Sequence, residues 1–185
     1  MRDKRVKVPN TIDTRPASPK DISYAASIGV KLPVDATKSD AKALIDRDLD
    51  NDEPAKPEFI AYARAMGMLC SDYIGNKALH NQLFDNISLE DKAALFCFCV
   101  YKFHFDDSNE NLLEHPRRQL FENFGKSFSK DGYFTLSLED YLGEDSVAFG
   151  KSTKEVNGVK KNIYGGSIYG RAYKEAMQYL KENLE

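Results

Sequence analysis

Residues Pro19–Val30 have the sequence PKDISYAASIGV, and residues Pro57–Met68, 38 positions later, have the sequence PEFIAYARAMGM. Pro, Ile, Tyr, Ala and Gly recur at matching positions in the two stretches. Recurrence at a fixed period indicates a duplicated structural unit. We therefore predict two copies of one unit, with a shared set of core positions at Ile22, Tyr24, Ile60 and Tyr62.

Local signals mark the first helix of each copy. Ser18 and Asp21 stand three residues apart, which is the spacing of a capping box at a helix start. Proline at the first helical position costs nothing, because the N–H that it lacks would be unpaired there anyway. Gly29 and Gly67 stand where the apolar period ends, as is typical of residues that end a helix with a positive φ. Both first helices should therefore be short.

An extended link and a second helix follow in each copy. Pro33 disfavours helix in the residue before it, so residues 32–36 should be extended. Thr37 with Asp40 should then cap the next helix. The second helices are predicted at Lys38–Leu49 and Gly75–Phe84. The connection that leads to the second helix is predicted to be three residues shorter in the second copy.

The first copy also carries a family resemblance. Its sequence IGVKLP, from Ile28, followed by TKSDAKALI, from Thr37, resembles the SAP family of small DNA-binding modules. The resemblance implies two helices packed around an extended link and a duplex nucleic acid contacted by Lys31, Lys38 and Lys42. The second copy departs from this pattern, because its link reads SDYIGNK and has fewer basic residues. The repeat is also similar to segments of uncharacterised bacterial and phage proteins.

Most of the remaining chain has helical periods. Ser88–Asp91 forms another capping box before Ala93–Phe105, the most apolar stretch of the sequence. A helix that is apolar on all sides should be buried on all sides, so we expect a central helix here. Further helices are predicted at Pro116–Phe128, after a cap at Ser137–Asp140, and from Ile168 onward.

One segment near the C-terminus has a different period. Glu155–Lys160 places Asn157 and Gly158 between two valines, and both residues tolerate the positive φ of a tight hairpin turn. We predict a β-hairpin here, to which a strand at Arg5–Val8 would add within the limit set by Pro9.

The predicted fold class is mainly α (α+β). It comprises a helical body with a duplicated two-helix unit, one central buried helix and a small C-terminal β-hairpin. The predicted domains are a basic N-terminal arm at residues 1–17, the duplicated unit at residues 18–86, and a helical core with hairpin and C-terminal helix at residues 87–185.

Charge is distributed unevenly along the 185 residues, whose formal net charge is −3. Residues 1–20 sum to +4 and residues 147–174 to +5, whereas residues 21–146 sum to −10. Such an asymmetry either steers a polyanion toward the basic ends while the acidic middle repels it, or is satisfied by opposite charges inside one fold or a dimer. The basic segments supply most of the predicted nucleic-acid-binding residues, and the SAP resemblance implies Lys38 and Lys42 as well. Those of the basic segments are Arg2, Lys4, Arg5, Lys7, Lys154, Lys160, Lys161 and Arg171.

Two further groups of residues suggest chemistry. Gly165, Gly166 and Ser167 precede a predicted helix. They form either a glycine turn with Ser167 as the helix cap, or a phosphate site made by the free amides of the helix start with Arg171 nearby. His104 and Asp107 would lie one turn apart if their helix continued, and the pair would then share a divalent ion that activates water. No ligand spacing repeats in this segment, so we predict no metal site and no cofactor.

Composition excludes other classes of protein. The longest unbroken apolar run, Ala93–Tyr101, is nine residues, against the roughly 20 that a bilayer-spanning helix needs. The charged start, Met1–Arg5, is followed by no apolar stretch like a secretion signal. Three cysteines are an odd number, which favours reduced thiols over a disulfide framework. We expect a cytoplasmic protein without membrane contact.

These observations favour a non-enzymatic binding protein that engages nucleic acid or a nucleoprotein through the basic arm and the hairpin. Two alternatives stay open. One is a phage-type, anti-CRISPR-like inhibitor that binds a host defence nuclease through its acidic middle by protein–protein contact. The other is a metal-dependent nuclease at His104 and Asp107. The sequence leaves the oligomeric state open.

Overall fold

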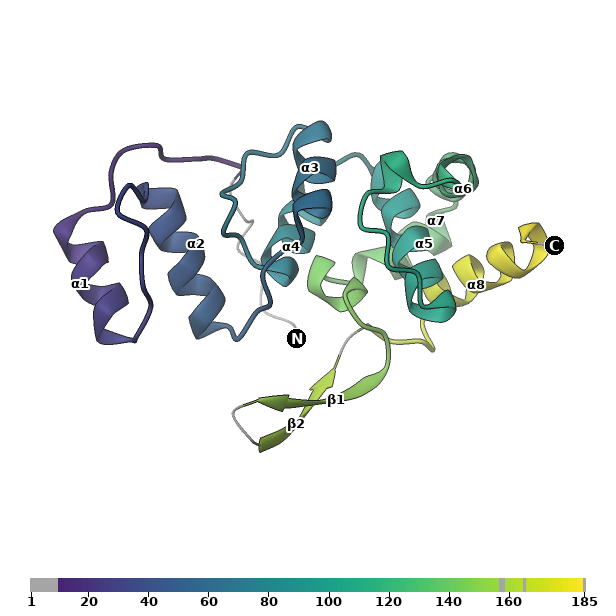
Figure 1. Cartoon of the computed structure of the whole chain (residues 1–185). Helices are drawn as coiled ribbons and strands as arrows, with labels where there is room; N and C mark the ends of the chain where they lie inside the picture. Colours follow the sequence, from purple (N-terminus) through teal and green to yellow (C-terminus); the bar gives the residue numbers. More distant parts are fainter. Residues whose placement is uncertain (1–9, 157–158, 165, 185) are drawn as a thin grey trace. The chain divides into compact units, whose positions relative to one another are not determined.

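A computed structural model describes residues 10–156, 159–164 and 166–184, and within 151–164 it describes the backbone alone. The chain divides into two compact units, unit 1 from Met1 to Asn86 and unit 2 from Ile87 to Glu185 (Figure 1). Within the described residues, no helix is both long enough and apolar enough to cross a membrane.

Unit 1 contains two pairs of helices (Figure 1). The first pair is α1 (Pro19–Ser27) with α2 (Lys38–Leu49), and the second pair is α3 (Pro57–Ala65) with α4 (Asn76–Asn86). The two helices of each pair are in contact, and an extended link joins them. Each pair therefore has the predicted order of helix, link and helix.

The backbone of unit 1 repeats with a constant period of 38 residues. A β-bridge joins Pro16 to Thr37 in the first copy, and its counterpart joins Pro54 to Gly75. The predicted shortening of the second connection is therefore wrong, since α2 begins at Lys38 and α4 begins 38 residues later. The predicted difference of three residues came from aligning the pair Ala43-Leu44 of the first copy with the pair Ala78-Leu79 of the second copy.

Glycine ends the first helix of each copy as predicted. Gly29 has φ 83° and Gly67 has φ 84°, a conformation that side chains with a Cβ rarely adopt. The amide of the next residue then turns back to the helix in both copies, with Val30 N–H donating to the carbonyl of Ala25 at 2.9 Å. These turns start the links at equivalent places.

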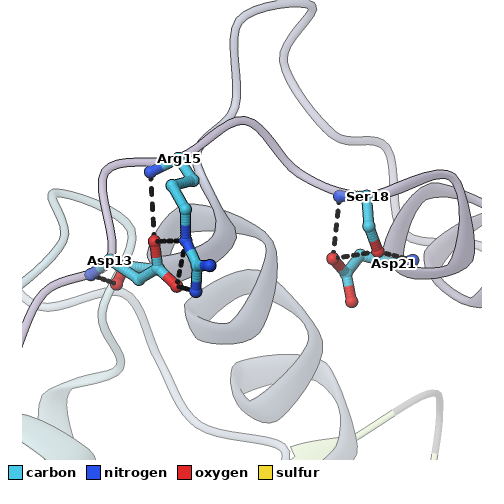
Figure 2. A network of polar contacts seen from close by, with 5 residues as sticks. Asp13, Arg15, Ser18 and Asp21 are labelled. Atoms are coloured by element: carbon cyan, nitrogen blue, oxygen red, sulfur yellow. Dashed lines mark hydrogen bonds and ion pairs between the residues drawn. The ribbon is translucent and has the colours of Figure 1, made fainter.

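Polar side chains fix the helix starts of the first copy. Ser18 Oγ accepts the amide of Asp21 at 3.2 Å, and the Asp21 carboxylate accepts the amide of Ser18 at 2.8 Å (Figure 2). Thr37 and Asp40 form a second capping box in the same way. Figure 2 also shows Asp13 beside Arg15, whose side-chain hydrogen bonds lower the pKa of Asp13 to about 2. Both caps predicted for the first copy are confirmed, and of the capping box predicted at Ser88–Asp91 the bond from the Asp91 amide to Ser88 Oγ is present.

The start of α4 is capped from a distance. Gly75 has no side chain at the position that Thr37 holds in the first copy, and Asp52 supplies the acceptor instead. The Asp52 carboxylate accepts the amides of Lys77 and Ala78, each at 3.1 Å. A Cβ at position 75 would collide with this carboxylate. Glycine here therefore makes room for an acceptor from the preceding strand-like segment.

Burial differs between the copies. Ile60 is 5% exposed and Tyr62 is 1% exposed, so both are core residues as predicted. Their counterparts Ile22 and Tyr24 are 51% and 47% exposed. The prediction of core positions is therefore wrong for the first copy, where α1 buries only Ala25 fully.

Unit 2 is organised around α5 (Leu89–Phe105), against which α6 (Arg118–Phe128) and α8 (Arg171–Asn183) pack (Figure 1). Every residue from Ala93 to Tyr101 is buried, which confirms the central buried helix. The α6 helix comes close to α5 at Gly125, where a Cβ would lie 2.5 Å from the carbonyl oxygen of Glu90. Short 3-10 turns occur at Leu112–Glu114 and Gly143–Ser146.

Two helix starts in unit 2 differ from prediction. The α7 helix spans Gly132–Glu139, and Asp131 caps it by accepting the amides of Tyr133 and Phe134. Ser137, predicted as a cap, lies inside this helix, and its Oγ accepts the amide of Ala172 at 2.9 Å. The α8 helix begins at Arg171, three residues after the predicted start, because residues 166–170 form turns.

Unit 2 also contains β1 (Lys151–Val156) and β2 (Val159–Tyr164), paired antiparallel with Lys154 opposite Lys161. In the described part of the chain these strands pair only with each other. Two strands alone do not make a layer on which helices can pack, and the body of each unit is helical. The fold class is therefore helical, and the expected α+β class is wrong. The predicted turn at Asn157-Gly158 and strand at Arg5–Val8 lie outside the described residues.

Candidate nucleic-acid interface

The predicted basic residues fall into three groups. Those of the N-terminal arm lie outside the described residues: Arg2, Lys4, Arg5 and Lys7. Those of β1 and β2 are described by their backbone alone: Lys154, Lys160 and Lys161. The remaining three have acidic neighbours in their own units: Lys38, Lys42 and Arg171.

The two lysines of α2 lie close to carboxylates of unit 1. Lys38 is near enough to Asp13 and Asp21 to contribute to lowering the pKa of both carboxyls, after their own hydrogen-bond partners. Lys42 forms an ion pair with Asp46 one turn further along the helix. These carboxylates compete with phosphate for the lysines that the SAP-like pattern singled out.

The second copy offers no matching cations. Position 76, the counterpart of Lys38, is asparagine, and position 80, the counterpart of Lys42, is His80. His80 is buried, stacks against Phe59 with 4.2 Å between ring centroids, and bonds the Asn76 carbonyl through Nδ1 at 2.8 Å. It is a packing residue of unit 1.

Hydrogen bonds within unit 2 join the two ends of the basic segment 151–164. Gly150 N–H donates to the carbonyl of Gly166 at 2.9 Å, and Phe149 forms a β-bridge with Gly166. Gly166 N–H in turn donates to the carbonyls of Asp145 and Ala148. The segment therefore leaves and re-enters unit 2 at one point, shortly before α8 begins.

Two of the residues that were predicted to bind phosphate have packing and hydrogen-bonding roles within unit 2. The amide of Gly166 is already used, and a Cβ there would lie 2.8 Å from the Tyr141 ring. Ser167 Oγ accepts the amide of Tyr169 at 3.1 Å, while the cap position of α8 is Gly170. Ser167 is thus not the helix cap that the sequence suggested. Gly165 lies outside the described residues.

Arg171 lies at the start of α8 among aromatic and acidic groups. Its guanidinium carbon is 5.1 Å from the centroid of the Tyr133 ring, and its Nε is 3.2 Å from Oε1 of Glu175. The pKa of Asp131 is lowered mainly by the hydrogen bond from the Phe134 amide, and the nearby Arg171 contributes to this lowering. Arg171 therefore lies over the Tyr133 ring and is paired with Glu175, and Asp131 is nearby.

The surface around Arg171 contains apolar side chains that sequence reasoning missed. Tyr133 and Leu136 of α7 are 72% and 64% exposed, and Tyr169, two residues before Arg171, is 79% exposed. On the same helix Phe134 and Leu138 are buried. Tyr133 and Leu136 are apolar residues outside the buried face of α7. The sequence could have indicated this exposed pair only if the start of α7 had been predicted correctly.

The acidic segment after α5 does not unite the alternative catalytic pair. Asp106 ends the helix in a left-handed conformation, with φ 52°, so His104 and Asp107 do not follow one another on a helical face. The Asp107 carboxylate instead bonds Nε2 of His115 at 3.2 Å. Burial alone would raise the pKa of Asp107, but hydrogen bonds from Asn109 and His115 outweigh it and lower that pKa. In the described part of the chain, no three His, Cys, Asp or Glu side chains are grouped as metal ligands would be.

The cysteines of the chain are buried thiols. Burial raises the pKa of Cys99 to about 11 and raises those of Cys70 and Cys97 as well. A thiol nucleophile needs a lowered pKa, so these residues lack the usual property of a catalytic cysteine.

Comparison with protein-family models, curated proteins and solved structures gives no significant match.

Proposed function

We propose that the protein is a non-enzymatic binding protein that contacts nucleic acid through residues 147–174. One observation carries this proposal: the bonds between Gly150 and Gly166 bring both ends of the basic segment to the start of α8. The four lysines of the segment and the basic residues of the first turn of α8 then belong to one region of unit 2: Lys151, Lys154, Lys160, Lys161, Arg171 and Lys174.

Electrostatics gives this region its preference for polyanions. Residues 147–174 contain six basic side chains and one acidic side chain, Glu155. Lys154 and Lys161 are partners in the register of β1 with β2, so two basic positions coincide along this segment. We further propose that this binding takes place in the cytoplasm.

Salt dependence tests the proposal. Each lysine that neutralises a phosphate releases counterions, so affinity should fall steeply as salt concentration rises. Replacing Lys154, Lys160 and Lys161 by alanine should weaken binding and reduce the slope of log affinity against log salt by about 2 to 3. The measurement is fluorescence anisotropy of the full chain with labelled DNA and RNA at several salt concentrations.

A matched control distinguishes the effect of lysines within residues 147–174 from the effect of the total charge of the chain. Replacing Lys20, Lys56 and Lys126 by alanine removes the same charge from exposed positions elsewhere, and the salt slope should stay unchanged. If the wild-type chain binds neither DNA nor RNA in a salt-sensitive way, the proposed function is incorrect. The protein inhibitor and the metal-dependent nuclease then stand as the remaining predictions.

A further inference from the structure

The surface around Arg171 contains the two most exposed aromatic side chains in the part of the chain that the structure describes, Tyr133 and Tyr169. In the helix that carries Tyr133, the residues that pack into the core are Phe134 and Leu138, which are 0% and 1% exposed. Neither tyrosine is therefore needed for packing. Two large rings at the surface of one region are typical of a binding site.

Bonds within unit 2 bring the two rings into one region. Ala172 N–H of α8 donates to Ser137 Oγ of α7, so the start of α8 lies against the helix that carries Tyr133. Arg171 contacts Tyr133 directly, and Tyr169 is only two residues from Arg171, within about 7 Å along the chain.

Arg171 holds the Tyr133 ring rather than serving as a free phosphate ligand. Its charge is partly satisfied by Glu175 at 3.2 Å and by the nearby Asp131. A guanidinium stacked on one side of a tyrosine restricts the ring while leaving much of the aromatic surface open, and 72% of Tyr133 is exposed. A restricted ring loses less entropy when a flat ligand stacks on it.

The lysines that precede this surface in the sequence carry the positive charge that attracts a phosphate backbone. The basic segment ends at Tyr164 in β2, five residues before Tyr169. Exposed aromatic rings next to a row of cations are the combination by which proteins bind single strands, because bases stack on rings while phosphates meet lysines. Bases inside a duplex are stacked on each other and have no free face to offer.

We propose that the ligand of this region is a single-stranded nucleic acid, whose bases stack on Tyr133 and Tyr169. This inference rests on the proposed function and adds the strandedness of the ligand and the residues that select it. The lysines supply attraction to any polyanion, and the tyrosines supply the preference for unpaired bases.

Anisotropy with three probes of about 16 nucleotides tests the inference. The probes are an oligothymidylate, a duplex of equal length, and a chain of abasic sites with the same phosphates. The wild-type protein should bind the oligothymidylate more tightly than either of the others. Replacing both tyrosines by alanine (Y133A/Y169A) should weaken oligothymidylate binding about twentyfold or more, because each stack is worth about 1–3 kcal/mol.

The salt slope distinguishes stacking from a general loss of structure. Y133A/Y169A should keep the wild-type slope, since it removes no charge, while Y133F/Y169F should keep the affinity within about twofold because the rings remain. Tyr24→Ala serves as a matched control, because Tyr24 is an exposed tyrosine of unit 1.

Two unfavourable results have different meanings. Wild-type affinity in Y133A/Y169A, or equal binding of the oligothymidylate and the abasic chain, would overturn the stacking inference and leave nucleic-acid binding in place. Absence of binding to all three probes by the wild-type chain would overturn the proposed function itself.

Discussion

Asp52 and Gly75 together perform the task that Thr37 performs in the first copy. Removing the carboxylate by Asp52→Ala leaves the amides of Lys77 and Ala78 without their acceptor. We expect a loss of about 1 kcal/mol in the free energy of unfolding, the usual cost of a missing helix cap. Urea unfolding of the full chain, followed by circular dichroism, measures this loss.

A second substitution tests whether the two caps are interchangeable. Gly75→Thr alone should destabilise the protein, because its Cβ collides with the Asp52 carboxylate. Combined with Asp52→Ala it should recover most of the lost stability, because threonine at this position provides the hydroxyl that caps α2 in the first copy. Strictly additive effects would contradict this coupling. Asp35→Ala is a suitable control, since Asp35 is exposed in the first link.

At the level of elements, the contact between α5 and α6 depends on a glycine. Gly125→Ala gains about 1 kcal/mol in helix propensity, but its Cβ would lie 2.5 Å from the Glu90 carbonyl and 3.1 Å from the Ala94 Cβ. Backbone cannot move aside as a flexible side chain can, so the clash should outweigh the propensity. We expect a net loss of about 1–3 kcal/mol.

Thermal unfolding of Gly125→Ala and of a matched variant measures that balance. Gly132, at the start of α7, has open space where a Cβ would point, so Gly132→Ala should change stability little or raise it slightly. Equal midpoints for the two variants would show that α6 can shift away from α5 without cost.

Elements were predictable where a single local signal decided them. The run Ala93–Tyr101 has one physical solution, burial on all sides, and it is buried throughout. The start of α7 was predicted at Ser137, but Asp131 caps this helix, and Ser137 inside it accepts the amide of Ala172 in α8, a contact that only the fold creates. Tertiary contacts likewise bury Tyr62 but leave Tyr24 half exposed, although the two have the same place in the repeat.

At the level of the whole molecule, charge was readable from the sequence and the arrangement of aromatic side chains was not. The excess of cations in residues 147–174 follows from counting, and it pointed to Arg171. Tyr133 and Tyr169 lie 36 positions apart, and their common location depends on the packing of α8 against α7. A sequence pattern records neither that packing nor which face of α7 remains exposed.

The two basic ends of the chain provide a last test at this scale. Residues 2–9 contain four cations and one acidic residue, Asp3, and residues 147–174 contain six cations. If both ends contact one nucleic acid, deleting residues 2–9 should reduce the salt slope by about 2 to 3, as replacing three lysines of the basic segment does. The combination of both changes should then reduce the slope by about the sum of the two. An unchanged slope after the deletion would mean that residues 147–174 bind alone, since counterion release counts only the phosphates that the protein neutralises.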